Sequence, residues 1–138
     1  MVKLKATLLD GKYHDVDSSE MAFKMAARLS YKDAMAKCNP IMLEPIMNVE
    51  VRVPDEFTGT IMGDFNKRRG SIMGMDLVDG YQIITAQAPM AEMMRYPIDL
   101  RAMTQGMGSY TMSFERYDPV PSNIADKIIA AAKSEAEE

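Results

Sequence analysis

One pattern, spread over residues 46–117, restricts this chain to few folds. Apolar residues at every second position of segment 47–53 predict a strand with one buried face. Two further strand-like runs occupy 71–77 and 81–88. The pair Asp79-Gly80 between them predicts a β-hairpin, because both residues tolerate positive φ. The chain must therefore build an antiparallel sheet here.

Helical segments separate these strands. Aromatic and aliphatic residues recur every four positions over 57–65, which predicts a helix with Gly70 as its left-handed C-terminal cap. A second helix is expected near 90–103, interrupted around Pro97. Alternation over 110–115 then predicts a fourth strand. The order strand, helix, strand, strand, helix, strand is the split βαβ, ferredoxin-like α+β arrangement, with both helices on one sheet face.

The first 44 residues predict much less structure. Alternation over 2–8 indicates a half-buried strand, and an apolar stripe over 22–29 indicates a helix packed on two sides, ending at Asn39-Pro40. Residues 41–45 are expected to form a connector. One strand and one helix cannot form an independent core, so we expect residues 1–44 to belong to a larger domain.

The turn before this helix carries the most suggestive side chains. Gly11 permits a tight turn, Lys12 can meet a phosphate, Tyr13 can stack on a base and His14 can donate hydrogen bonds. This mixture suits RNA contact. The alternative is that Tyr13 tucks under the turn and His14 is an ordinary loop residue. Asp17 or Ser18, with Glu20, is expected to cap the helix.

Composition narrows the function classes. The net charge of −4 argues against a general nucleic-acid binder, so any RNA contact must be local or assisted by an assembly. A single His and a single Cys cannot build a His-rich or paired-thiolate metal site, and Cys38 is expected to be a small buried filler. The fifteen Met residues are expected to fill the core. No segment resembles a signal peptide or a membrane span.

Four motifs resemble one known family. Asp10–Lys24 closely resembles part of domain IV of bacterial translation elongation factor G, and the other three resemble its domain V: Leu43–Met47, Gly63–Gly70 and Asp99–Gly106. The resemblance covers nearly the whole chain in the family's order. It implies that residues 1–44 are a partial β-α segment of domain IV, whose fold is like domain 2 of ribosomal protein S5. It also implies a ferredoxin-like domain V at 45–121 and a C-terminal helix at 122–138, capped by Ser122 or Asn123.

The resemblance also implies a role. Elongation factor G is a GTPase that moves tRNA and mRNA through the ribosome, with the domain IV tip at the decoding region and domain V near the stalk base. The expected partners are ribosomal RNA, stalk-base proteins, tRNA and mRNA in the cytoplasm, with no membrane. GTP and Mg²⁺ would be bound by the full-length parent, and no catalytic residue or cofactor is expected in this part. The candidate contact residues are Gly11, Lys12, Tyr13, His14, Lys67, Arg68, Arg69, Arg101 and Gln105.

Two alternatives stay open from the sequence. Met94–Ile98, Met107 and Phe65 depart from the family pattern, which suggests a divergent paralogue or one specialised in ribosome recycling. A ferredoxin-like small-ligand regulatory module is the alternative from another class. For Arg68 and Arg69, favourable interaction with the helix dipole competes with RNA contact.

One structural hazard follows from the partial domain. A first strand without its neighbours leaves an open edge. We expect residues 1–38 to pack on domain V and the last helix, to be poorly ordered, or to self-associate by edge pairing with another copy.

Overall fold

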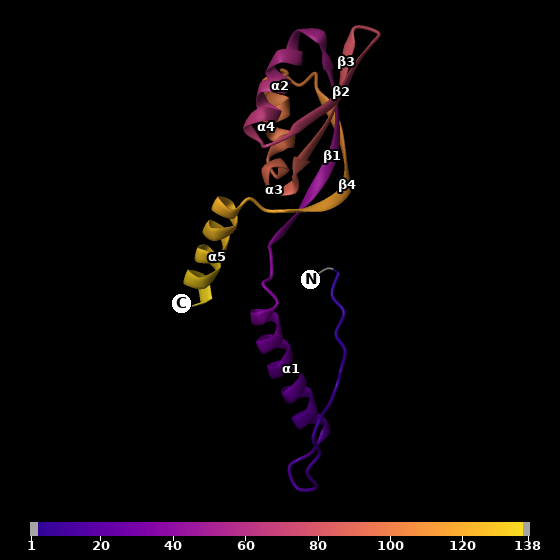
Figure 1. Ribbon diagram of the computed structural model, residues 1–138. Coiled ribbons are helices and arrows are strands. Elements are labelled where there is room, and N and C mark those ends of the chain that lie inside the picture. Colours follow the sequence, from indigo (N-terminus) through magenta and orange to yellow (C-terminus); the bar gives the residue numbers. More distant parts are fainter. Residues whose placement is uncertain (1–2, 137–138) are drawn as a thin grey trace. The chain divides into compact units, whose positions relative to one another are not determined.

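The computed structural model describes residues 3–136, and the chain divides into two compact units (Figure 1). Unit 1 is Met1–Pro40 and unit 2 is Ile41–Glu138. No helix within residues 3–136 is both long enough and apolar enough to cross a bilayer.

Unit 2 is built on a four-stranded antiparallel sheet. Its strands are β1 (Leu43–Pro54), β2 (Ser71–Val78), β3 (Tyr81–Pro89) and β4 (Ser109–Pro119). They lie in the order β2-β3-β1-β4. This is the order of the split βαβ arrangement, so the predicted ferredoxin-like fold is confirmed.

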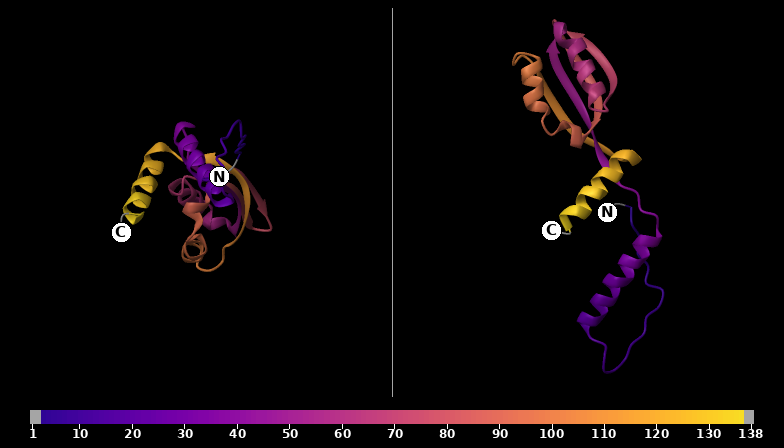
Figure 2. Two further views of the ribbon diagram at one scale, coloured as in Figure 1. Left: turned by 90° about the horizontal axis from the view of Figure 1, so that it is seen from below. Right: turned by 90° about the vertical axis from the view of Figure 1, so that its left-hand side faces the viewer.

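The helices of the ferredoxin-like domain lie on one face of the sheet (Figure 2). The 3₁₀ turn η1 (Asp55–Phe57) leads into α2 (Thr58–Lys67), and α3 (Met90–Met93) is followed by α4 (Tyr96–Met103). The predicted interruption is confirmed, because Pro97 lies in the first turn of α4, where a missing N–H costs no hydrogen bond.

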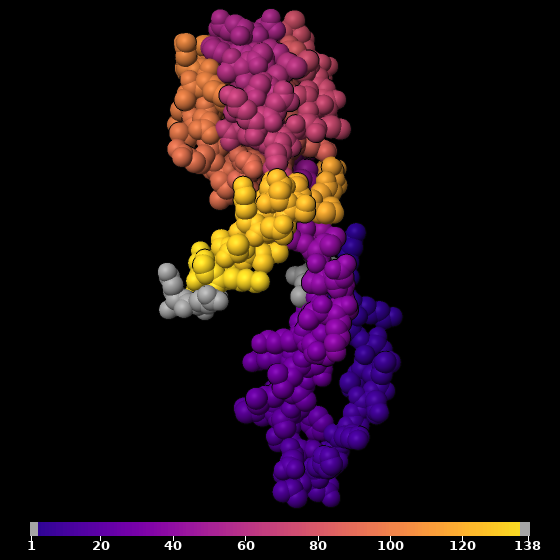
Figure 3. Space-filling view, turned by 60° about the vertical axis from the view of Figure 1, so that its left-hand side comes forward, coloured from indigo at the N-terminus to yellow at the C-terminus, as the bar shows by residue number. Residues whose placement is uncertain are grey.

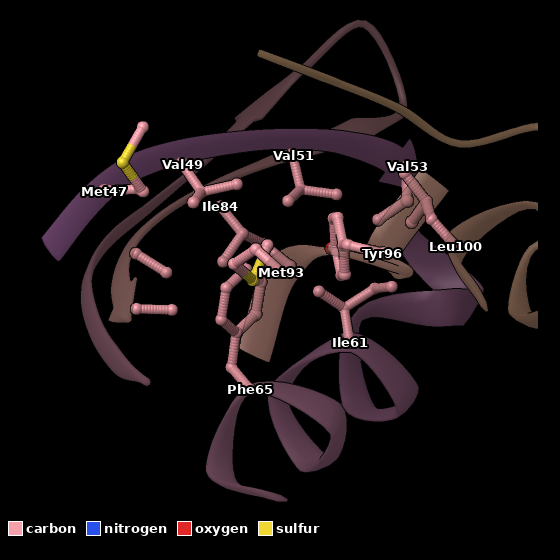
Figure 4. Close-up of a cluster of buried hydrophobic side chains, with 12 residues drawn as sticks. Met47, Val49, Val51, Val53, Ile61, Phe65, Ile84, Met93, Tyr96 and Leu100 are labelled. Carbon is pink, nitrogen blue, oxygen red and sulfur yellow. The ribbon is translucent and has the colours of Figure 1, made fainter. Parts of the chain in front are cut away.

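The core lies between the sheet and these helices (Figure 4). The residues of β1 that alternate toward the helices are buried, as the sequence predicted, and the same core includes side chains from α2, β3, α3 and α4: Met47, Val49, Val51, Val53, Ile61, Phe65, Ile84, Ala86, Ala88, Met93, Tyr96 and Leu100. Val51 stands opposite Ile84 on β3 and Tyr110 on β4, so these three residues share the covered face.

Turn geometry confirms one glycine prediction and corrects another. Asp79 and Gly80 both have positive φ, as expected for the hairpin. At the end of α2, however, the left-handed residue is Arg69, with φ 56°, and not Gly70. Gly70 is needed for space, because an added Cβ would lie 2.8 Å from Cδ1 of Phe65 and 3.1 Å from its carbonyl oxygen.

Strand β1 begins earlier than expected. Residues 41–45 were predicted to be a connector, but Leu43, Glu44 and Pro45 pair with β4. Beyond β4, α5 (Ser122–Ala136) forms as predicted, with Ser122 inside the helix. Ile124, Ile128 and Ile129 of α5 are not buried, and Ile128 remains 46% exposed.

Unit 1 contains a single helix within residues 3–40, α1 (Glu20–Lys37), which ends as predicted before Asn39-Pro40. The strand predicted at 2–8 is wrong: residues 4–9 have no regular secondary structure, Lys3 is a bend and residue 2 lies outside the described residues. Strand propensity needs a partner strand to supply hydrogen bonds, and the described part of unit 1 has none.

Burial in unit 1 also differs from expectation. No residue from 3 to 40 is buried, so α1 does not pack on two sides. Cys38 is exposed instead of filling a core. The helix cap is Ser19, whose Oγ accepts from the N–H of Ala22 at 3.1 Å, and not Asp17 or Ser18. Apolar periodicity predicted the helix correctly. It could not predict whether another part of the chain packs against the apolar face of α1.

Candidate nucleic-acid interface

The loop that precedes α1 forms one end of unit 1 (Figure 1 and Figure 3). Ser18 organises it, because its Oγ accepts from the N–H of His14 at 2.8 Å and its N–H donates to the His14 carbonyl at 3.0 Å. The turn itself lies at Asp15–Asp17. Gly11 has neither positive φ nor a close neighbour, so the tight turn expected there does not form.

The side chains predicted to contact RNA are brought together at this loop. Lys12, Tyr13 and His14 are all exposed, and Tyr13 is 65% exposed. One face of Tyr13 lies over Phe23 of α1, with ring centroids 6.3 Å apart and planes 14° apart. This stack holds the phenol in place and leaves most of its surface available for a base.

A shallow hollow of about 180 Å³ lies between the loop and α1. It is lined by both polar and apolar residues: Lys12, His14, Asp17, Ser18, Ala22, Phe23 and Ala26. A cation and an imidazole beside an aromatic wall are suited to a phosphate next to a base or a sugar.

Arg68 is one of the predicted contact residues of unit 2, and its guanidinium is bound by other side chains and a carbonyl of the same unit. Its Nε meets Asp64 at 2.7 Å and its Nη2 meets Asp99 at 2.6 Å. Its Nη1 donates to the carbonyl of Glu92 at 2.7 Å, and its guanidinium lies 5.1 Å from the ring centroid of Tyr96. Burial lowers the pKa of Arg68, but the hydrogen bonds to both carboxylates outweigh it and raise that pKa.

Arg69 is also engaged by carboxylates. It makes a bidentate pair with Glu44, at 2.8 and 2.9 Å, and its Nε lies 3.3 Å from Glu92. The hydrogen bond to Glu44 raises the pKa of Arg69. Sequence reasoning proposed a helix-dipole role or an RNA contact for both arginines and missed these carboxylates. The i,i+4 spacing of Asp64 and Arg68 was the available signal. RNA contact by either arginine stays a prediction, and it would compete with these pairs.

The remaining candidate contact residues of unit 2 are exposed to solvent. Lys67 and Arg101 are exposed, and neither makes an ion pair within residues 3–136. Gln105 is exposed in the turn after α4, with φ 52°. Over the same residues, no group of three or more His, Cys, Asp or Glu side chains is arranged to hold a metal ion.

Two motifs that carried the family resemblance meet in space. Arg68 and Asp64 belong to the first, Asp99 belongs to the second, and the Arg68–Asp99 ion pair joins α4 to the residue that ends α2. Thr104 of the second motif is fully buried, accepting from the N–H of Gly108 at 2.9 Å and donating to the Leu100 carbonyl at 2.7 Å. These motif residues therefore stabilise the ferredoxin-like fold.

The chain is similar to known proteins over nearly its whole length. Residues 41–128 match the model of the elongation factor G C-terminus, and residues 1–39 match that of elongation factor G domain IV. A crystal structure of a protein from Thermus thermophilus is 39% identical, with a TM-score of 0.79 over 94% of this chain. The chain spans 19% of that protein's length.

The two matches follow each other along the chain and define a class, the C-terminal part of a translation elongation factor. The chain belongs to the elongation factor G family.

Proposed function

We propose that this chain is the ribosome-binding C-terminal part of a translational GTPase that promotes movement of tRNA and mRNA. The consecutive matches to domain IV and to the C-terminus carry the proposal, since they cover residues 1–39 and 41–128 of one chain. The exposed group Lys12, Tyr13 and His14 supports it, because a cation, a stacking ring and an imidazole are suited to RNA backbone and bases.

Each unit has its own part in this proposal. The loop of unit 1 contacts tRNA and mRNA at the decoding region. Lys67, Arg101 and Gln105 of unit 2 contact ribosomal RNA or protein near the stalk base. GTP and Mg²⁺ would be bound by a GTP-binding domain of the full-length parent, outside this sequence, and would supply the hydrolysis step there. The protein acts in the cytoplasm.

The loop is tested in the full-length factor with His14→Ala. Loss of one hydrogen-bonding or stacking contact is expected to slow single-turnover translocation by about tenfold. Lys24→Ala is the matched control, because it removes an exposed ion pair with Glu20 on α1 without touching the loop. Equal translocation rates for both variants and the wild type would rule out the role of the loop.

One observation favours a second candidate. Met94 and Met107, which depart from the family pattern, are 72% and 46% exposed. These two departures therefore change the surface of unit 2 and not its core. A divergent paralogue specialised in ribosome recycling would split ribosomes at a normal rate while moving tRNA slowly. Comparing these two rates for the full-length protein decides between the candidates.

A further inference from the structure

The pairing of β1 with β4 continues beyond the rest of the sheet. The β1–β3 ladder starts at Ile46, opposite Pro89, whereas the β1–β4 ladder continues back to Leu43, opposite Pro119. A register shift between Ile46 and Met47 separates this extension from the core strands. Residues 43–45 are therefore held by one neighbouring strand only, and a two-stranded ribbon is marginal by itself.

A pair of ionic contacts fastens this ribbon to the helical layer. The side chain of Glu44 is only 12% exposed, and its carboxylate accepts hydrogen bonds from both terminal nitrogens of Arg69. The Nε of Arg69 also forms an ion pair with Glu92 of α3. Two parallel hydrogen bonds fix direction as well as distance. The Glu44–Arg69–Glu92 cluster, called the clamp below, ties the start of β1 to α3 and to the turn that follows α2.

Arg69 has a left-handed backbone conformation that is unfavourable for a residue with a side chain, and its ion pairs offset this cost. It is the left-handed residue after α2, and the N–H of Gly70 donates to the Phe65 carbonyl at 2.8 Å in the Schellman pattern. Glycine adopts this conformation without strain, so arginine is costly here. Gln105 takes the same position after α4, with φ 52°, but an uncharged amide forms no ion pair.

Few residues join the two units without being held by backbone hydrogen bonds. In unit 1, α1 ends at Lys37, and the N–H of Cys38 still bonds to the carbonyls of Ala34 and Met35. In unit 2, the carbonyl of Met42 accepts from Val120 at 2.9 Å. Only Asn39, Pro40 and Ile41 lie between these anchors.

We propose that Arg69 is a positioning residue for the domain IV segment. The clamp fixes the direction in which the chain leaves β1, and it confines the hinge between the units to Asn39–Ile41. The consequence for tRNA movement rests on the proposed function, whereas the clamp itself is a property of unit 2.

Hydrogen exchange on the 138-residue chain tests the clamp without a ribosome. Arg69→Gly removes the pair and relieves the strained φ, and Glu44→Gln weakens the pair while keeping the side-chain shape. Both should speed exchange over residues 43–46, by about tenfold for Arg69→Gly and less for Glu44→Gln, with residues 49–53 unchanged. Gln105→Gly is the matched control, because it relieves the same strain without breaking an ion pair.

Two results would overturn the clamp. Unchanged exchange over 43–46 in Arg69→Gly would mean that β4 alone holds the ribbon. Equal acceleration over 43–46 and 49–53 would make Arg69 a residue of general stability.

The full-length factor tests the positioning role. Arg69→Gly should slow translocation severalfold while ribosome-independent GTP hydrolysis stays unchanged. Asp79→Gly, which relieves a positive φ in the β2–β3 hairpin outside the proposed contact residues, should leave both rates unchanged. If translocation responds to His14→Ala but not to Arg69→Gly, the positioning role is wrong and the proposed function stands. If it responds to neither, the proposed function is wrong, and only the exchange result still supports the clamp.

Discussion

At the residue scale, the core of unit 2 contains one unpaired polar atom among the described side chains. Tyr96 is fully buried, and its hydroxyl has no hydrogen-bond partner within residues 3–136. Its ring is held between Phe65, at 5.6 Å between centroids, and Tyr110, at 5.3 Å. The ring thus contributes packing, while the hydroxyl loses its hydration without compensation.

Removing that hydroxyl should therefore not harm the fold. Tyr96→Phe is expected to leave the free energy of unfolding unchanged or to raise it by about 1 kcal/mol, because an unpaired buried donor costs free energy. Urea denaturation at neutral pH measures the change. Tyr117→Phe, at a residue that is 49% exposed, is a control with no expected effect. A clear loss of stability in Tyr96→Phe would reveal a hydrogen bond to an internal water.

The same residue predicts a pH dependence. Burial raises the pKa of Tyr96 above its ordinary value, and the nearby Asp64 charge adds to this effect. The folded chain keeps the proton, while the unfolded chain releases it above about pH 10. Stability should therefore fall as pH rises beyond that value. Urea midpoints between about pH 8 and 11 should fall less steeply for Tyr96→Phe than for the wild type, and parallel curves would exclude the effect.

At the element scale, α2 and α4 end in the same way. Each is followed by a non-glycine residue with positive φ, and the next residue donates back into the helix: Gly70 to Phe65, and Gly106 to Arg101 at 2.9 Å. The hydrophobic pattern predicted both helices, but it placed the left-handed residue of α2 one position late. That position depends on the close approach of Gly70 to Phe65 and to the Gln87 carbonyl of β3, which local sequence does not reveal.

Two glycines in this region should respond in opposite directions to alanine. Gly70→Ala would place a Cβ 2.8 Å from Phe65, so we expect a loss of about 1–3 kcal/mol in the free energy of unfolding. Gly63→Ala lies in the interior of α2 with nothing within 4 Å of the new Cβ, and it should gain up to about 1 kcal/mol. Chemical denaturation of both variants checks the pair. Similar effects of the two substitutions would contradict the packing argument.

At the scale of the whole molecule, the two units differ in how they are stabilised. Unit 2 has one continuous buried cluster, whereas no residue of unit 1 from 3 to 40 is buried. Leu8, Leu9 and Val16 of unit 1 are more than nine-tenths exposed. Stability in water comes mainly from apolar burial, so the cooperative unfolding transition belongs to unit 2.

Proteolysis and melting should show this difference. Trypsin is expected to cut first after Lys3, Lys5 or Lys12, which lie in the segment without regular structure, and only later within unit 2. A chain comprising residues 41–138 should melt within a few degrees of the full 138 residues. A much lower melting temperature for the shorter chain would mean that unit 1 stabilises unit 2.

The expectation of self-association rested on an open strand edge at residues 2–8. Residues 4–9 form no strand in the described structure, so that particular edge is absent there. Light scattering over a range of protein concentrations measures the oligomeric state directly, and a dimer that is lost on removing residues 1–18 would restore the edge-pairing prediction.

Periodicity and local φ preferences were enough to predict the ferredoxin-like order of elements, the buried face of β1 and the hairpin at Asp79-Gly80. The motifs that resemble elongation factor G could also be recognised from the sequence alone. Asp64, four positions before Arg68, was the one carboxylate partner that the sequence could suggest. The other carboxylate partners of Arg68 and Arg69 emerged only from the folded chain, because they stand 23 to 31 positions away. Residues 4–9 illustrate the same limit, since an alternating pattern becomes a strand only where another strand lies beside it to complete the hydrogen bonds.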